Sequence, residues 1–79
     1  MKFDRITFDP QMMGGRACIR GMRVTVSLLV NLVANRMSTE EILKAYPYLE
    51  AEDVQQALQY AVAVQKPYRG AYENNSNGN

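Results

Sequence analysis

Residues 38–47, Ser-Thr-Glu-Glu-Ile-Leu-Lys-Ala-Tyr-Pro, decide the fold, because they specify both ends of one short helix. Ser38 stands three residues before Glu41, the spacing of a capping box, in which each side chain satisfies a backbone N–H at the helix start. Pro47 ends the helix, because the residue before a proline is pushed out of the helical region. The stretch therefore predicts a helix from Ser38 to about Tyr46, whose inward face carries Ile42, Leu43 and Tyr46.

Longer helical patterns flank this short helix on both sides. Residues 51–66 have apolar side chains at helical spacing, namely Val54, Ala57, Leu58, Ala61 and Val62. Residues 26–35 have the same periodicity, at Leu28, Leu29, Leu32 and Val33. Thr25 or Ser27 is the expected N-cap of this first helix. The lengths and short connections are typical of a helix-turn-helix unit with the first helix packed across it, but the pattern alone favours a plain three-helix bundle without a nucleic-acid role.

The first 25 residues form a basic arm rich in strand formers. Residues 5–8 alternate and end at Asp9-Pro10, residues 18–20 form a second extended piece, and residues 22–26 alternate again. A lone ribbon is marginal in water, so we expect it to pack on the helices or pair with another chain. The fold class is therefore mainly α: residues 1–66 form one domain (arm 1–25, three-helix core 26–66), and residues 67–79 form a polar tail.

Size and composition limit what the chain can do. Its 79 residues give one domain with a marginal core. Cys18 is the single cysteine and histidine is absent, so neither an internal disulfide nor a zinc site is expected, and oligomerisation, at least to a homodimer, is the remaining support. No Ser-His or Cys-His pair exists, so we predict a non-enzymatic protein without a cofactor. The lone thiol and the lack of a membrane-spanning apolar run predict a soluble, cytoplasmic protein.

The charges are divided along the chain although the net charge is only +1. Residues 1–36 hold six basic and two acidic residues, a net +4, and residues 37–79 hold three basic and six acidic residues, a net −3. The basic half offers arginines of the arm for contact with DNA phosphates, namely Arg5, Arg16, Arg20 and Arg23. A solvated face, or ion pairs with the acidic half of a second subunit, explains the same arginines and is slightly favoured.

The third helix is a poor recognition helix, although a helix-turn-helix protein would place it in the major groove. It begins with Glu50, Glu52 and Asp53, whose carboxylates would repel phosphates. Three glutamines on the helix are capable of reading base edges, namely Gln55, Gln56 and Gln59. The charge of the helix start therefore directs any DNA contact to the arm.

Two motifs carry a family resemblance. The run GGRACIRGMRVTV at residues 14–26 and the run MSTEEILKAYPYL at residues 37–49, together with Ile6, Asp9-Pro10, Asp53-Val54 and Ala57-Leu58, resemble the bacterial domain-of-unknown-function family 433 over about residues 5–64. The resemblance implies a homeodomain-like three-helix fold. It also implies an antitoxin that neutralises a PIN-like ribonuclease toxin and autoregulates by binding operator DNA. A DNA-binding regulator without a toxin, or a structural homo-oligomer with no nucleic-acid role, is the alternative.

The chain departs from the family pattern at Ala17, Met22 and Arg36. The family usually has proline, a small hydroxyl residue and glycine at these three positions. A glycine before Met37 suits a left-handed helix terminus, and a non-glycine residue in that conformation costs about 1 kcal/mol. We therefore expect Asn35, rather than Arg36, to take the left-handed conformation.

The tail holds candidate anchors for a protein partner: Tyr68, Arg69 and Tyr72. Tyrosine and arginine are enriched among the residues that dominate binding energy at interfaces. The resemblance implies a tail that wraps the toxin, with Arg69 approaching the metal-binding carboxylates of the nuclease. An ordinary polar terminus without a partner explains the same residues.

Overall fold

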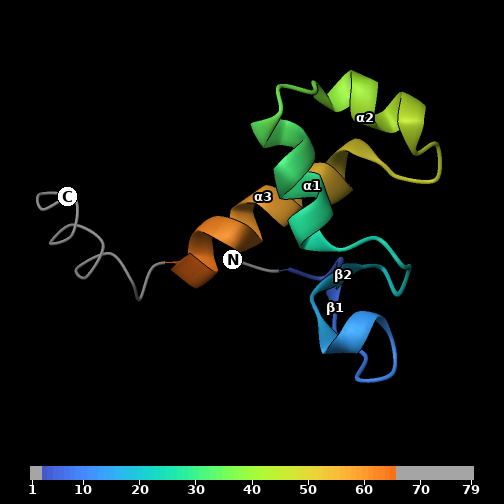
Figure 1. The fold of residues 1–79 in the computed structure, drawn as a ribbon, viewed down its shortest axis with the longest axis vertical. Coiled ribbons are helices and arrows are strands. Elements are labelled where there is room, and N and C mark those ends of the chain that lie inside the picture. Colours follow the sequence, from blue (N-terminus) through green and yellow to red (C-terminus); the bar gives the residue numbers. More distant parts are fainter. Residues whose placement is uncertain (1–2, 66–79) are drawn as a thin grey trace, which may run out of the picture.

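The structure is a computed structural model that describes residues 3–65 (Figure 1). Its elements, in chain order, are β1 (Ile6–Thr7), the 3-10 helix η1 (Met13–Gly15), β2 (Cys18–Ile19), α1 (Val26–Ala34), α2 (Thr39–Ala45) and α3 (Ala51–Gln65). The predicted fold class, a three-helix core behind a short N-terminal hairpin, is confirmed. Figure 1 shows α2 and the hairpin at opposite ends of α1. No helix in residues 3–65 is both long and apolar enough to cross a lipid bilayer.

Both predicted helix starts form as side-chain caps. The Thr25 hydroxyl accepts a hydrogen bond from the Leu28 N–H at 3.0 Å and begins α1. At the start of α2, the Ser38 hydroxyl accepts from the Glu41 N–H at 3.1 Å, and the Glu41 carboxylate accepts from the Ser38 N–H at 2.8 Å. The capping box is thus confirmed, and α2 ends at Ala45, before Pro47.

The end of α1 corrects one expectation. Arg36, not Asn35, is left-handed, with a φ of 72° against −93° at Asn35. The cause is a Schellman motif, in which the two N–H groups beyond the helix bond back into its last turn. The Arg36 N–H donates to the Val33 carbonyl at 2.9 Å and the Met37 N–H donates to the Leu32 carbonyl at 3.0 Å. This pair of bonds fixes the left-handed position at residue 36, whichever side chain stands there.

The arm folds into a small hairpin. β1 and β2 are antiparallel, with Ile6 opposite Ile19 and Thr7 opposite Cys18. After β2 the chain turns through Arg20 and Gly21, whose φ values are 46° and 71°, and the Met22 N–H donates to the Ile19 carbonyl at 2.8 Å. Two consecutive positive φ values are typical of a type I′ turn. The third extended piece predicted at residues 22–26 contributes only a bridge between Thr25 and Cys18.

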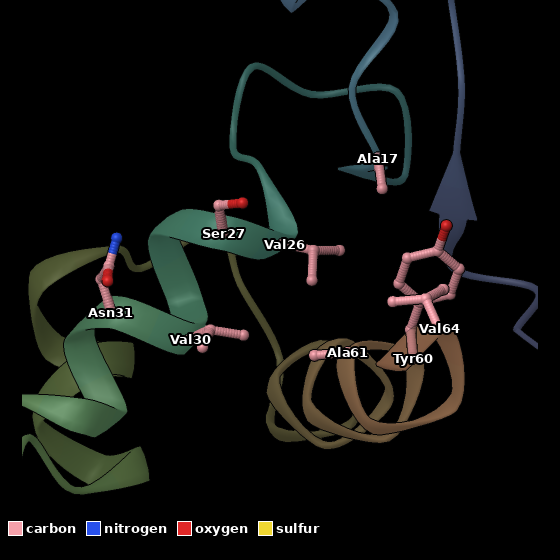
Figure 2. A pocket seen from close by; sticks show the side chains of 8 residues that line it. All are labelled: Ala17, Val26, Ser27, Val30, Asn31, Tyr60, Ala61 and Val64. Atoms are coloured by element: carbon pink, nitrogen blue, oxygen red, sulfur yellow. The ribbon is translucent and has the colours of Figure 1, made fainter. Parts of the chain in front are cut away.

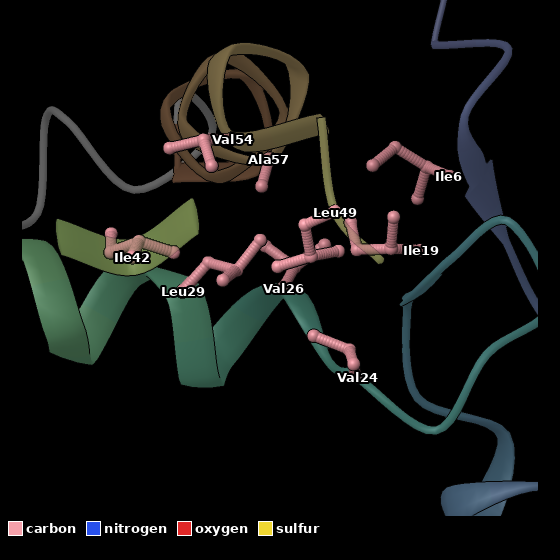
Figure 3. Packing of buried hydrophobic residues seen from close by; sticks show 9 residues of the cluster. All are labelled: Ile6, Ile19, Val24, Val26, Leu29, Ile42, Leu49, Val54 and Ala57. Carbon is pink, nitrogen blue, oxygen red and sulfur yellow. The ribbon is translucent and has the colours of Figure 1, made fainter. Parts of the chain in front are cut away.

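The arm and the helices share one hydrophobic core (Figure 3). Figure 3 shows Ile6 and Ile19 of the hairpin beside Leu49, which precedes α3, and Leu29 of α1 between the hairpin and Ile42 of α2. All five side chains are at most 8% exposed. Cys18 is buried and free, as expected of a small apolar residue on a strand. The hairpin therefore packs on the helices, as predicted for a ribbon that is marginal alone.

Candidate functional site

Asp53 joins the arm to α3. It lies in the first turn of α3, and its side chain is fully buried. Its Oδ1 accepts from Arg5 Nη1 at 2.9 Å and from Arg20 Nε at 3.0 Å, and its Oδ2 accepts from Arg20 Nη2 at 2.8 Å and from the Glu50 N–H at 2.8 Å. Arg20 thus binds the carboxylate through two parallel hydrogen bonds, the strongest geometry for such a pair. The buried charge is fully partnered, as a buried charge must be to be tolerated.

The surroundings of Asp53 keep it ionised. Burial raises the pKa of the carboxyl, but hydrogen bonds from Arg20, from the Glu50 N–H and from Arg5 outweigh burial and hold the pKa at about 2, below the ordinary 3.8. The guanidinium pKa of Arg20 is raised, chiefly by its bond to Asp53. Both partners therefore remain charged across the physiological pH range.

The contact of Arg5 and Arg20 with Asp53 is called the arm–α3 junction, and further contacts extend it along α3. Arg5 Nη1 also donates to Glu50 Oε1 at 2.6 Å, and the Arg5 N–H donates to Gln56 Oε1 at 3.0 Å. Gln56 Nε2 in turn donates to Asp4 Oδ1 at 2.8 Å. These bonds hold the arm on α3. Gln56 is only 7% exposed, so its side chain is not accessible to a base edge, a role that the sequence had allowed. Gln55 remains exposed on the same helix.

The four arginines predicted to contact DNA fall into two pairs. Arg5 and Arg20 meet at Asp53, and Glu50 balances the second positive charge. Arg16 and Arg23 are exposed and form no ion pair within residues 3–65; Arg23 Nη1 only approaches the sulfur of Met13 at 3.7 Å. The structure therefore gives the first pair a structural role and leaves the second pair accessible.

The acidic start of α3 pairs with two arginines of the arm of the same chain. Ion pairs between the arm arginines and the acidic half, which the sequence allowed between two subunits, form within one chain for Arg5 and Arg20. Residues of the tail proposed as anchors, Tyr68, Arg69 and Tyr72, lie outside the described residues. Within residues 3–65, no group of three or more histidine, cysteine or acidic residues is arranged to hold a metal ion.

A groove between α1 and α3 is a candidate binding surface that the sequence did not predict. Figure 2 shows Val26 and Val30 of α1 directed toward α3, where Ala61 and Val64 lie, while Ser27 and Asn31 point away from α3. The groove is open to solvent, has a volume of about 320 Å³ and is completed by Ala17 and Tyr60. The available signal was the absence of a charged residue from Val24 to Asn35, because a helix without charges is typical of one that is covered on most sides.

Comparison with known proteins places the chain in a family. Residues 6–61 match the family model described as "Protein of unknown function (DUF433)". The uncharacterized protein y4eO of Sinorhizobium fredii (strain NBRC 101917 / NGR234) is 40% identical over 65 residues, which are 82% of this chain and 28% of that protein. A crystal structure of a DUF433 member from Anabaena variabilis ATCC 29413 is 35% identical, with a TM-score of 0.70 over 87% of this chain and 66% of that one.

The matched segment is most of the chain, so this protein belongs to the DUF433 family. The family resemblance predicted from the two motifs is thereby confirmed. The chain spans less than a third of the length of the curated relative and just under two thirds of the crystallised one.

Proposed function

We propose that this DUF433 protein is a non-enzymatic, antitoxin-like binding protein of the cytoplasm that neutralises a PIN-like ribonuclease by binding it. The proposal starts from the resemblance of its motifs to antitoxin-like members of the family. The observation that supports a protein partner most directly is the partial neutralisation of the arm. Arg5 and Arg20, half of the basic residues that made DNA attractive, are engaged by Asp53 and Glu50.

The pairing of Arg5 and Arg20 matters because binding to DNA depends on free cationic groups. Each phosphate contact releases a counterion and adds to affinity, and nonspecific binding rests almost wholly on this effect. An arginine whose charge is already balanced by a carboxylate gains less from a phosphate, and its engaged N–H groups are not available to that phosphate. Three N–H groups of Arg20 are engaged, two by Asp53 and a third by the Tyr48 carbonyl at 3.0 Å. A protein partner that binds away from these arginines does not depend on their charge.

The proposal is tested by co-expression with a PIN-like protein encoded beside this chain. We expect the chain to relieve growth inhibition by the nuclease and to co-purify with it. The triple variant Tyr68→Ala, Arg69→Ala and Tyr72→Ala should lose both effects, whereas the control Gln55→Ala, on the exposed face of α3, should keep them. Absence of a complex together with unrelieved growth inhibition would overturn the proposal.

A second candidate function, autoregulation by operator DNA, rests on Arg16 and Arg23. Both are exposed and without an ion pair within residues 3–65. Anisotropy of a labelled upstream fragment would be measured over a salt series. If both arginines contact phosphates, the double variant Arg16→Ala/Arg23→Ala should reduce the salt slope by about 2. The control Arg36→Ala removes a positive charge outside the arm and should leave the slope unchanged.

A further inference from the structure

The groove between α1 and α3 leaves apolar side chains uncovered. Val64, on its α3 side, is 45% exposed, and Val30, on its α1 side, is only partly buried. α1 is apolar on most of its circumference, yet only Val26 and Leu29 are buried. A helix of this kind normally packs against neighbours on several sides. The groove is therefore a surface that a further chain segment would cover.

The lining of the groove defines the chemistry of its occupant. None of its residues is charged, and no charged residue occurs from Val24 to Asn35. A phosphate or carboxylate placed here would lose water without gaining an ionic partner, which is costly. The polar residues at the rim, Ser27 and Asn31, have uncharged side chains without a hydrogen-bond partner within residues 3–65. The groove thus fits an uncharged, largely apolar helix with a few hydrogen-bonding groups.

We propose that this helix is α1 of a second copy of the chain, so that the groove is a homodimer interface. In a two-fold dimer the same patch meets itself, so it must be complementary to itself. The α1 surface meets this condition because it carries no charge that would face its like. The hydroxyl of Ser27 and the amide of Asn31 each donate and accept hydrogen bonds, so each is able to pair with its own copy.

The resulting arrangement is a four-helix contact in which α1 of each copy lies along the α1–α3 groove of the other. It covers Val30 and Val64 and adds apolar surface to a core that is small for an independent domain. The proposed nuclease contacts, Tyr68, Arg69 and Tyr72, are not among the residues of this proposed interface, so the dimer does not depend on nuclease binding. The inference goes beyond the proposed function and fails separately from it.

The test compares two valines that lie two residues apart on α3. Val64 lines the groove, whereas Val62 is more exposed, at 67%, and does not line it. The mass of the full chain would be measured by sedimentation equilibrium from about 1 to about 100 µM, a range in which mass action shifts a dimer. We expect a dimer for the unchanged chain and for Val62→Glu. Val64→Glu should weaken dimerisation at least about tenfold, because two carboxylates would enter an uncharged groove.

A second variant keeps the test decisive if Val64→Glu disturbs folding. Asn31 is exposed, so Asn31→Lys should leave the monomer fold intact, checked by far-ultraviolet circular dichroism, and should abolish the dimer by like-charge repulsion. Gln55→Lys, on an exposed part of α3, is its charge-matched control and should stay dimeric. A monomeric unchanged chain throughout the range, or a dimer that survives Asn31→Lys, would overturn the proposal. Equal weakening by Val62→Glu and Val64→Glu would also overturn it, since the contact would then lie elsewhere.

Discussion

Arg20 in the arm and Arg36 after α1 are arginines in the same unfavourable backbone conformation, with φ values of 46° and 72°. Their side chains differ. The guanidinium of Arg20 donates two hydrogen bonds to the buried carboxylate of Asp53 and one to the Tyr48 carbonyl. The side chain of Arg36 is exposed and forms no hydrogen bond or ion pair with residues 3–65. At Arg20, the side-chain bonds compensate for the energetic cost of the left-handed conformation. At Arg36, the backbone bonds of the Schellman motif alone impose that conformation.

The difference separates two reasons for keeping a residue with positive φ. The left-handed turn at Arg20 and Gly21 returns the chain toward α1, while the side chain of Arg20 fastens the arm to α3. Glycine at position 20 would suit the turn but could not fasten the arm. Glycine at position 36 would suit the helix end and lose no described bond. The same substitution should therefore have opposite effects at the two sites.

The largest effect is expected when the shared partner of the arm arginines is removed. Asp53→Ala deletes all four hydrogen bonds to the carboxylate and leaves Arg5 and Arg20 without it. We expect a loss of about 3 kcal/mol in the free energy of unfolding, measured by urea denaturation. Glu52→Ala, an exposed neighbour on the same helix, should change it by less than about 0.5 kcal/mol. Equal losses for both variants would contradict the central role of Asp53.

Protonation of Asp53 in acid should weaken its contact with Arg5 and Arg20 and lower the free energy of unfolding within a defined pH range. The Asp53 pKa is about 2 in the folded chain, against 3.8 ordinarily. Because the unfolded chain takes up this proton more readily, the contribution of Asp53 is complete above about pH 5 and is lost as the pH falls toward 2. We expect this loss to be about 2 kcal/mol. Urea denaturation of the unchanged chain and of Asp53→Asn over this range would measure it, since the variant should lack this part of the acid dependence.

Arg20→Gly tests whether side-chain bonding outweighs backbone relief. The glycine removes the left-handed penalty but leaves the buried Asp53 with only Arg5 and the Glu50 N–H. We expect the melting temperature to fall by roughly 5–10 °C. Arg20→Lys should recover little of it, because an ammonium group cannot make the two parallel bonds of a guanidinium. A melting temperature at or above that of the unchanged chain would show that the junction contributes little to stability.

The helices were predictable because their signals are local. The caps at Thr25 and Ser38, the proline after α2 and the apolar periodicity of α3 each lie within a few residues of the feature they determine. The left-handed residue after α1 was assigned one position too early. Asparagine tolerates that conformation better than arginine, but the spacing of the Schellman bonds, not the preference of the side chain, decided the position.

The candidate sites were predictable only in part, because they depend on contacts distant in sequence. Arg5 and Asp53 are 48 residues apart. The division of charge along the chain predicted attraction between the two halves, but not that it is satisfied within one chain. The groove depends on how α1 and α3 cross, which periodicity does not determine. The uncharged run from Val24 to Asn35 was its only trace in the sequence.

Arg36→Gly should produce the smallest effect and the opposite sign. The Schellman bonds hold residue 36 left-handed, where glycine carries no steric penalty. We expect the free energy of unfolding to rise by about 1 kcal/mol and the melting temperature by roughly 4–8 °C, measured by thermal denaturation. Arg36→Ala is the control: it removes the charge and the long side chain but keeps the Cβ, so it should give no comparable gain. An equal gain for alanine would assign the effect to the arginine side chain, and the contrast between Arg20 and Arg36 would then not rest on the backbone.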